Sequence, residues 1–570
     1  MSENTYKIGV YICECGPNIA NAVDIDRVVE TVSKYPDIYV VKRHKLLCSG
    51  PGKDFLHEDI IAEGLTHVVV AACSPKDHET TFANICKKSG LNPYLYQLIN
   101  IREQCAWMIK DQEAATNKVI SYIRSGVRRV KYHSSLEQKE LESTPDVLVI
   151  GGGIAGIESA LNLASNERKV YLVEKSGQLG GVAGQFEGVL SCGGLSPEVI
   201  RSKIESVKTN LNIRLFYDSE VENIIGFFGN FEVTVRCPKD EKVEIKVGSV
   251  VISTGFELFN PTNCDKYGIV SGTHVMLIEE VESKAKTGLV TLKDGSAPKS
   301  IALVHCTGRD EVGYCSGVCC NRLFAVAEYF KSNYPEIEIF DVYRNLPKTS
   351  PEDAAQISLL QEKGVVFIRA NDASIEGQFG KTVVKYKTEK GIEKTIDVDL
   401  AVIAPAIIPG GDTQKIAQML DICIDKFGFF EEEHSLTGSF KTSVDGVFVA
   451  GCAVGPKGII DSATQALAAS GNILSRLIPG KKIHPEVKTS EVIEALCTGC
   501  QTCVAVCSYG ATSYDAIRRV SVVNEAICRG CGNCAGSCPS GAIRAKHFTE
   551  KQLHQEVIEA ISASNKVNQE

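Results

Sequence analysis

Residues 146–175 read DVLVIGGGIAGIESALNLASNERKVYLVEK, and this stretch decides the fold of the middle of the chain. An apolar run leads into Gly151, Gly153 and Gly156, spaced as G-x-G-x-x-G, and a helix-like stretch and a second apolar run follow. The first glycine permits a tight turn, the second lets the backbone approach a pyrophosphate, and the third lets the helix pack closely on the strand. Phosphate charge then lies at a helix N-terminus. Glu174 ends the second run, 18 residues beyond Gly156, where an acidic side chain can bind a ribose hydroxyl. The stretch predicts a dinucleotide-binding Rossmann unit; a merely structural glycine turn is the alternative.

Further motifs extend this unit along the chain. They are QLGG at Gly180 and Gly181, VVISTGF around Gly255, and TSVDGVFVAGCA around Gly451. Together with GGGIAGIESA, they resemble two-dinucleotide-binding flavoproteins similar to thioredoxin reductase over about residues 145–480. The resemblance implies that the first loop binds FAD, with contacts from Gly151, Gly153, Ile154, Ala155, Gly156, Glu174, Lys175, Gly181, Gly255 and Gly451. That family commonly carries an aspartate after the last glycine motif; this chain has Cys452 there, so the contact must be made otherwise.

A thiol-rich stretch stands where such flavoproteins carry a second glycine loop for NAD(P)H. After the predicted strand KSIALVH the chain reads HCTGRDEVGYCSGVCC over residues 305–320, without a G-x-G-x-x-G pattern, so NAD(P)H is not expected to bind. Cys315 and Cys319 are spaced i, i+4, which on a helix places both thiols on one face, with Cys320 about 100° around. Cys306 comes from the strand end, and the four thiols are predicted to bind one [4Fe-4S] cluster. Buried or redox-exchanging cysteines are the alternative.

A cysteine repeat near the C-terminus gives the most specific metal motif. The spacing C-x2-C-x2-C-x3-C occurs twice, 31 residues apart, as in bacterial two-cluster ferredoxins. In those proteins the fourth thiolate of each run binds the other cluster. The predicted ligand sets are Cys497, Cys500, Cys503 and Cys538 for one cluster, and Cys528, Cys531, Cys534 and Cys507 for the other. Zinc is the alternative, but it leaves no role for the third and fourth thiols of each run.

The N-terminal region alternates short β-branched runs with helix-like stretches, which predicts a small parallel α/β sheet. The predicted strands end near Cys13 and Cys15, near Cys48, near Cys73 and shortly before Cys105. Because ligands bind at the carboxyl ends of parallel strands, these positions predict one more [4Fe-4S] cluster, with Cys13 and Cys15 competing for one ligand place. Cys86 lies in a helical stretch and is predicted to be a packing residue. A core role for some of the other thiols is the alternative.

Composition excludes several classes of function. The chain has 570 residues, a formal net charge of −9 and no Lys/Arg-rich run, so a nucleic-acid partner is not expected. No apolar run reaches the about 18 residues that span a bilayer, and the first residues lack a secretory signal, so we expect a cytoplasmic protein. In that compartment the 23 cysteines are expected to be metal or redox groups rather than disulfides.

The expected fold class is α/β, in four parts. They are an N-terminal α/β domain with a cluster (1–135), a thioredoxin-reductase-like FAD domain (145–485) with a second nucleotide-like subdomain at about 257–400, a two-cluster ferredoxin domain (486–547) and a C-terminal helix (548–570).

This order of parts, with the phrases AACSPKDHETTF, LNPYLYQLINIREQCAW, GNFEVTV, YCSGVCC and KHFTEKQL, resembles the A-subunit family of heterodisulfide reductases (HdrA) almost end to end. The resemblance implies an oxygen-sensitive electron-transfer flavoprotein in a larger complex, and the thiol motifs described above together predict four [4Fe-4S] clusters beside the FAD. Implied partners are heterodisulfide reductase B- and C-like subunits, a hydrogenase- or dehydrogenase-linked donor and, as a further candidate, ferredoxin, with the chain a dimer in a larger complex. Long members insert another ferredoxin-like domain after GNFEVTV, and this chain is a short form without it.

The favoured function is therefore that of an oxidoreductase subunit in which flavin and clusters exchange electrons. The resemblance also raises flavin-based electron bifurcation, although Ala325 stands where many members carry a lysine near the flavin. Two other functions stay open. One is a stand-alone NAD(P)H-dependent reductase similar to the glutamate synthase small subunit, and the other is a non-catalytic hub that wires partners together.

Overall fold

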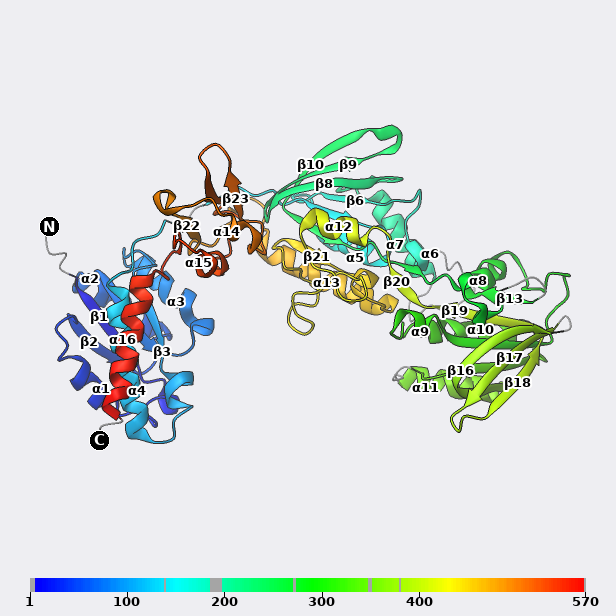
Figure 1. Ribbon diagram of the computed structural model, residues 1–570, viewed down its shortest axis with the longest axis horizontal. Coiled ribbons are helices and arrows are strands. Elements are labelled where there is room, and N and C mark those ends of the chain that lie inside the picture. The colour runs from blue at the N-terminus through cyan, green and yellow to red at the C-terminus, as the bar shows by residue number, and fades with distance from the viewer. Residues whose placement is uncertain are drawn as a thin grey trace. The chain divides into compact units, whose positions relative to one another are not determined.

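The computed structural model describes residues 6–137, 140–184, 197–269, 273–346, 351–378 and 381–567. The chain divides into two compact units (Figure 1). The terminal unit combines Met1–Glu140 with His484–Glu570, and the central unit is Leu141–Ile483.

The terminal unit is built on a parallel sheet of four strands in the order β2-β1-β3-β4, as the sequence predicts. Every residue of β1 and β3 is buried, because helices cover both faces of the sheet, and these strands are accordingly continuous apolar runs. The strands are β1 (Ile8–Cys13), β2 (Val40–His44), β3 (His67–Ala72) and β4 (Tyr96–Asn100), and the helices are α1 (Ile25–Val32), α2 (Gly50–Ala62), α3 (Pro75–Lys88) and α4 (Gln112–Val130).

The cysteine repeat folds in the same unit as two antiparallel strand pairs, β22 with β25 and β23 with β24. Its elements are β22 (Ser490–Val492), α14 (Thr502–Ala505), β23 (Thr512–Asp515), β24 (Val520–Val523), α15 (Asn533–Ser537) and β25 (Ile543–Ala545). The final helix α16 (Glu550–Val567) lies along α4, where the buried carboxylate of Glu559 pairs with Arg124 at 2.7 Å and Arg128 at 3.0 Å. These ion pairs join helix α16 to helix α4 of the N-terminal part of the chain.

The central unit holds two sheets. The first is five-stranded in the order β21-β11-β5-β6-β7, with α5 and α13 packed on each other beside it. Its strands are β5 (Val147–Ile150), β6 (Val170–Val173), β7 (Ile213–Phe216), β11 (Ser249–Ile252) and β21 (Val447–Val449), with α5 (Ile154–Leu163), α7 (Pro197–Thr209), α13 (Ile459–Arg476) and an attached three-stranded sheet of β8 (Glu220–Phe227), β9 (Asn230–Arg236) and β10 (Lys242–Val247).

The second sheet of the central unit is seven-stranded in the order β13-β19-β14-β15-β16-β17-β18. The chain enters it through β12 (Phe256–Leu258) and leaves through β20 (Ile407–Pro409), which pair antiparallel. Its strands are β13 (Val275–Leu277), β14 (Ser300–Thr307), β15 (Glu338–Tyr343), β16 (Val365–Gln378), β17 (Lys381–Thr388), β18 (Glu393–Val398) and β19 (Leu400–Pro405), with α8 (Ile278–Thr287), α9 (Arg309–Val312), α10 (Cys319–Asn333) and α11 (Pro351–Glu362).

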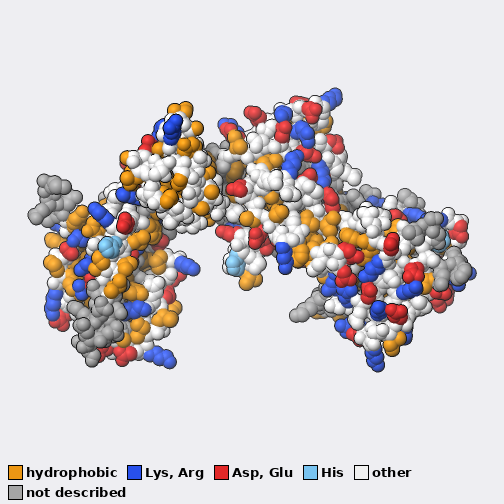
Figure 2. Space-filling model, in the orientation of Figure 1, with side chains coloured by type: hydrophobic (Ala, Val, Ile, Leu, Met, Phe, Trp, Pro, Cys, Tyr) orange, Lys and Arg blue, Asp and Glu red, His pale blue; other side chains and the backbone are white. Residues whose placement is uncertain are grey.

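Acidic and basic side chains are interspersed over the face of the molecule shown in Figure 2. No helix within the described ranges combines the length and the apolar character needed to cross a bilayer.

Candidate flavin site and thiol clusters

The first and third glycines of the dinucleotide loop are required by the fold itself. Gly151 follows β5 with φ +102°, and a Cβ there would lie 2.3 Å from the carbonyl oxygen of Ser253. A Cβ on Gly156, in the first turn of α5, would lie 1.9 Å from the carbonyl oxygen of Gly151. Neither position can accept a side chain without moving backbone, so α5 packs against the loop only because both residues are glycine.

The second glycine of the motif, by contrast, has free space beside it. Gly153 is the N-cap of α5 with φ −72°, and a Cβ there would meet no atom within 4 Å. The space beside it belongs to a large cavity. Its neighbour Gly152 donates its backbone N–H to the Glu174 carboxylate at 2.7 Å, and Ser176 donates its backbone N–H at 2.8 Å. The loop therefore presents bare backbone at a helix N-terminus and holds an acidic side chain at its rim, which fits a dinucleotide.

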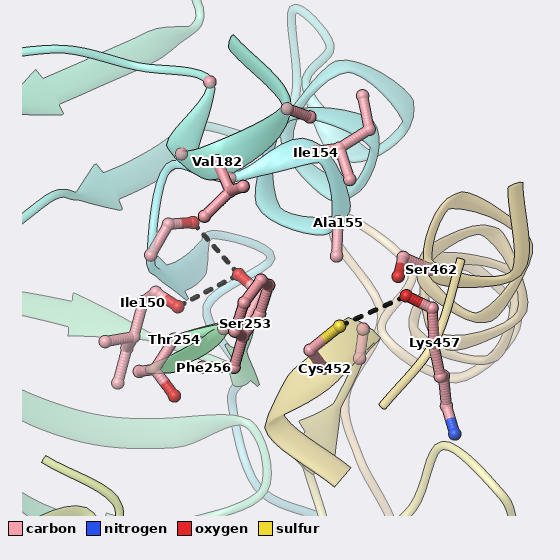
Figure 3. A pocket seen from close by; sticks show the side chains of 18 of the residues that line it. Ile150, Ile154, Ala155, Val182, Ser253, Thr254, Phe256, Cys452, Lys457 and Ser462 are labelled. Carbon is pink, nitrogen blue, oxygen red and sulfur yellow. Dashed lines mark hydrogen bonds between the residues drawn. The ribbon is translucent and has the colours of Figure 1, made fainter. Parts of the chain in front are cut away.

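The cavity has a volume of about 560 Å³ and lies in the central unit, lined by the dinucleotide loop, the start of α10 and the start of α13; Figure 3 shows part of its lining. Nine of the ten residues predicted to bind FAD line it, and Gly156 alone lies behind the wall. The nine are Gly151, Gly153, Ile154, Ala155, Glu174, Lys175, Gly181, Gly255 and Gly451. Lys415, Lys457 and Asp461 also line the cavity, and no sequence signal pointed to them because they belong to no glycine motif.

The wall near Cys452 lies where the resemblance to flavoproteins leads us to expect an aspartate. The Cys452 thiol donates to the carbonyl oxygen of Lys457 at 3.3 Å, and Gly451 donates its N–H to the side chain of Gln465 at 2.9 Å (Figure 3 shows the first bond). Cys452 is thus engaged within its own loop. Asp461, in the first turn of α13, lines the cavity and is the acidic side chain available at this wall.

The central thiols do not share one helix, so the predicted i, i+4 pairing of Cys315 with Cys319 is wrong. Gly313 and Gly317 adopt left-handed backbone conformations, with φ of +83° and +71°, which no α-helix can contain. α10 consequently begins at Cys319 and leaves Cys315 exposed in the preceding loop. Cys306, within β14, has φ +60°.

The start of α10 nevertheless faces the flavin cavity. Val318, Asn321 and Arg322, which flank Cys319 and Cys320, line the cavity together with the dinucleotide loop. Arg322 is held there by Glu279 at 2.8 Å and Glu282 at 2.7 Å, both on α8. Two buried thiols therefore lie within one turn of residues that would contact a bound flavin.

The two adjacent thiols differ in acidity. The pKa of Cys319 is lowered, mainly by a hydrogen bond from Cys320 and also by the nearby imidazole of His305. The same hydrogen bond and burial raise the pKa of Cys320. A thiolate at Cys319 is the form that binds iron.

The ferredoxin-like repeat brings thiols from both runs to one place. A small cavity is lined by Cys497, Cys500 and Cys503 of the first run and by Cys538, the last cysteine of the second. The backbone N–H of Ser521 donates to Cys497 at 3.4 Å, and that of Ser490 donates to Cys528 at 3.4 Å. Each serine backbone thus donates one hydrogen bond to the first cysteine sulfur of one run.

The N-terminal thiols divide between two faces of the sheet. Cys13 and Cys73 belong to the core on one face, which Cys48 adjoins, whereas Cys105 is fully buried in the core on the other face. Burial raises the pKa of Cys13, and the neighbouring thiols Cys15 and Cys48 raise it further. Cys15 has φ +43° and contacts both cores.

Cys86 is buried within α3, which confirms its predicted packing role. Within the described ranges, no three Cys, His, Asp or Glu side chains form a site for a single metal ion.

Comparison with known protein families gives separate matches for the central region of the chain and for the cysteine repeat. Residues 145–470 match the pyridine nucleotide-disulphide oxidoreductase family, and residues 496–550 match the 4Fe-4S dicluster domain. Among solved structures, thioredoxin reductases of Lactococcus lactis and T. acidophilum match 58% of this chain and 99% and 98% of theirs, with 17% and 18% identity and TM-scores of 0.40.

Curated relatives match over nearly the whole chain. The iron-sulfur A-subunit of the CoB–CoM heterodisulfide reductase of Methanocaldococcus jannaschii is 31% identical over 89% of this chain and 91% of its own. The A-subunit of the H2:CoB-CoM heterodisulfide,ferredoxin reductase of Methanothermobacter thermautotrophicus gives the same identity and coverage. The A-subunit of the ferredoxin/F420H2-dependent CoB-CoM heterodisulfide reductase of Methanosarcina acetivorans is 31% identical over 89% of this chain and 75% of its own. The chain therefore belongs to the HdrA family, the A-subunits of heterodisulfide reductases, which are oxidoreductases.

Proposed function

We propose that this chain is the FAD- and iron-sulfur-dependent electron-transfer subunit of a heterodisulfide-reductase-like complex. The observation that carries the proposal is the shared cavity: the dinucleotide loop forms one wall, and the thiol-bearing start of α10 forms another. A flavin there would have cysteine sulfur close by in the place that a nicotinamide loop occupies in related flavoproteins.

The residues that we assign to FAD binding are those that line the cavity. The open backbone at Gly153 would receive the pyrophosphate, Glu174 the adenosine ribose, and Asp461 the region that an aspartate serves in similar flavoproteins. When bound, FAD supplies two-electron redox chemistry, and iron-sulfur clusters supply one-electron steps. The protein's task is to hold these groups close and to exclude competing reactions.

We assign four [4Fe-4S] clusters to the thiols. Cys497, Cys500, Cys503 and Cys538 would hold one ferredoxin-like cluster, and Cys507, Cys528, Cys531 and Cys534 the other. Cys306, Cys315, Cys319 and Cys320 would hold the central cluster. For the N-terminal cluster the candidates are Cys13, Cys15, Cys48, Cys73 and Cys105. Cys13 and Cys73 belong to the core on one face of the sheet, and Cys15 and Cys48 pack against it, which favours a set drawn from these four over one that includes Cys105 on the other face.

The partners we propose follow from the relatives. Their names describe subunits of heterodisulfide reductases linked to H2, F420H2 or ferredoxin. These names support a hydrogenase- or dehydrogenase-linked donor and ferredoxin as partners. From the family resemblance we also propose B- and C-like subunits, with the chain a cytoplasmic dimer within the complex.

Flavin-based electron bifurcation is the finer form of this proposal. Ala325 is buried on α10 and offers no cation. Arg322, one turn earlier on the same helix, lines the cavity, but it is paired with the carboxylates of Glu279 and Glu282 and so supplies no net positive charge for an anionic reduced flavin.

Anaerobic purification from the native cell tests the proposal, with iron and flavin analysis and identification of the co-purifying subunits. We expect about one FAD per chain, about sixteen iron atoms for four four-iron clusters, and B- and C-like subunits. Rapid bleaching of the flavin by NADPH in the isolated chain would instead favour a stand-alone reductase. A flavin that stays oxidised when all clusters are reduced would favour a wiring hub.

A further inference from the structure

Two buried serines take the same position before each run of the cysteine repeat. Ser490 stands seven residues before Cys497, and Ser521 stands seven residues before Cys528, so the 31-residue repeat of the thiols includes a serine. Ser490 begins β22 and Ser521 lies in β24. Only 1% of Ser490 and 2% of Ser521 is exposed. Both halves of the repeat therefore hold a buried hydroxyl at the same separation from their thiols.

Ser521 contacts the first run, although it directly precedes the second. Its Oγ lies 3.1 Å from the sulfur of Cys503, and its backbone N–H donates to the sulfur of Cys497 at 3.4 Å. Ser521 also lines the small cavity that the thiols of the first predicted ligand set share. Four thiols around one cavity fit a four-iron cluster. Both polar groups of Ser521 would then face ligand sulfurs of that cluster, here called the first-run cluster.

Ser490 makes the same two contacts with the second run. Its Oγ lies 3.3 Å from the sulfur of Cys534, and its backbone N–H donates to the sulfur of Cys528 at 3.4 Å. The cluster proposed for this run is here called the second-run cluster. The serines are thus exchanged between the two halves of the repeat, as the fourth cysteines are in the predicted ligand sets.

The chemistry of a buried hydroxyl points to a role for these contacts. Buried strand positions favour valine, isoleucine and threonine, and a serine hydroxyl is costly there unless it is hydrogen-bonded. At both positions the partner is a cysteine sulfur. The hydrogen of a hydroxyl rotates to suit its partner, and a thiolate bound to iron can only accept. The serine therefore donates to the bound cluster and keeps its own proton.

We propose that Ser521 and Ser490 each donate a hydrogen bond to a ligand sulfur of the cluster in the other half of the repeat and thereby raise its reduction potential. The reduced cluster is more negative than the oxidised one by one charge, so donation stabilises it, and hydrogen bonds to the sulfurs are among the features that set cluster potentials. The low dielectric of a buried site strengthens such a bond. Both serines are positioning residues, because they act on iron only through sulfur. The inference rests on the proposed function, since it requires the thiols of the repeat to bind clusters.

Substitutions at the serines isolate the hydroxyl from the backbone. Alanine removes the hydroxyl and leaves the backbone N–H that donates to the first cysteine of the run. Ser521→Thr and Ser490→Thr keep the hydroxyl, and threonine suits a strand. Ser513→Ala is the matched control, because Ser513 is an exposed serine in β23 of the same repeat. Each alanine variant also contains an internal control, namely the cluster that its serine does not contact.

The test is an EPR-monitored redox titration of the anaerobic full-length protein. The first-run signal is the one that Cys500→Ala alters, and the second-run signal is the one that Cys531→Ala alters; both thiols are exposed. We expect Ser521→Ala to favour the oxidised first-run cluster by about tenfold, which is about 59 mV lower in potential for a one-electron couple. Ser490→Ala should do the same to the second-run cluster only.

In a half-reduced sample, each alanine variant should therefore shift the distribution of electrons between the two clusters by about tenfold toward the site that keeps its serine. The threonine variants and Ser513→Ala should titrate like the unsubstituted protein. Iron and FAD contents should be unchanged in every serine variant.

Unchanged potentials in both alanine variants with full iron content would overturn the inference. Equal shifts of both clusters in each variant would also overturn it, because the effect would then be a general one on the fold. So would loss of iron from the alanine variants, since the serines would then serve cluster assembly. If the unsubstituted protein shows no signal that depends on Cys500 or Cys531, the proposed clusters fail together with the inference. Intact signals that do not shift overturn the inference alone.

Discussion

The open second glycine of the dinucleotide loop gives the sharpest test of the flavin site. Replacing Gly153 with valine places a branched side chain in the cavity, because a Cβ at this position meets no protein atom within 4 Å. The backbone there is extended, with φ −72° and ψ −175°, so valine adopts it without strain. At a helix N-cap the exchange should cost the folded chain no more than about 1 kcal/mol.

The effect on FAD should be far larger. The side chain would hold a pyrophosphate away from the N–H groups at the start of α5. Losing two hydrogen bonds to a charged group costs about 3–6 kcal/mol, at about 1.5–3 kcal/mol each, which weakens binding by about 10²- to 10⁴-fold. We expect Gly153→Val to be purified without FAD and to resist reloading, while iron bound by the ferredoxin-like repeat in the terminal unit stays unchanged.

Flavin absorbance, a reloading titration and thermal melting of the flavin-free protein are the measurements. Gly471→Val is the matched control, because Gly471 lies in α13 of the same unit, also has open space around it, and does not line the cavity. Gly156→Ala should behave differently and destabilise the unit by about 1–3 kcal/mol or more, because its Cβ would strike backbone. A Gly153→Val protein that folds and retains stoichiometric FAD would refute the assignment of this loop.

Three further predictions concern the terminal unit. Gln501 is left-handed with φ +60° at the position where the second run has Gly532, so Gln501→Gly should raise the free energy of unfolding by about 1 kcal/mol in anaerobic urea denaturation, whereas Gln501→Ala should not. Glu559→Ala removes the buried carboxylate between two arginines of α4 and should lower the free energy of unfolding by about 1–3 kcal/mol; an unchanged melting curve would mean that α16 does not depend on these ion pairs. Burial lowers the pKa of His133 to about 3 from an unfolded value of 6.5, so the unfolded chain binds the extra proton below pH 6.5 and stability should fall with decreasing pH, by up to about 1.4 kcal/mol per unit until pH 3. His133→Asn, which keeps a donor toward the Tyr94 carbonyl, should flatten that dependence, and equal slopes in the two proteins would contradict it.

Much of the architecture is encoded in patterns that are local in the sequence. The apolar runs of β1 and β3 identify the parallel sheet, because strands covered on both faces are apolar at every position. The spacing of Gly151, Gly153 and Gly156 predicts a Rossmann loop for a similar reason. Within a single strand–helix turn, each of these positions must be free of a side chain so that the chain can turn, a pyrophosphate can approach or the helix can pack on the strand. The twofold cysteine spacing predicts that the runs exchange their fourth thiols, and Cys538 does lie beside the first run.

Helical periodicity gave a wrong prediction for Cys315 and Cys319. A spacing of four is compatible with a helix, but Gly313 and Gly317 take left-handed conformations that end one helix and delay the next. Glycine permits such conformations without demanding them, so the sequence alone does not decide between a continuous helix and a broken one.

Other features exist only through contacts between distant segments. Val318 and Arg322 reach the flavin cavity because the chain crosses between the two sheets of the central unit, more than 140 residues after the dinucleotide loop. The His305 side chain reaches Asp341 because β14 and β15 are neighbouring parallel strands. Spacing and periodicity are properties of a single segment, and they determined the presence of the loop, the sheets and the thiol motifs. Which thiols face the flavin, and which polar groups support them, was decided by tertiary packing, because those distances are set by strand order and helix placement rather than by separation along the chain.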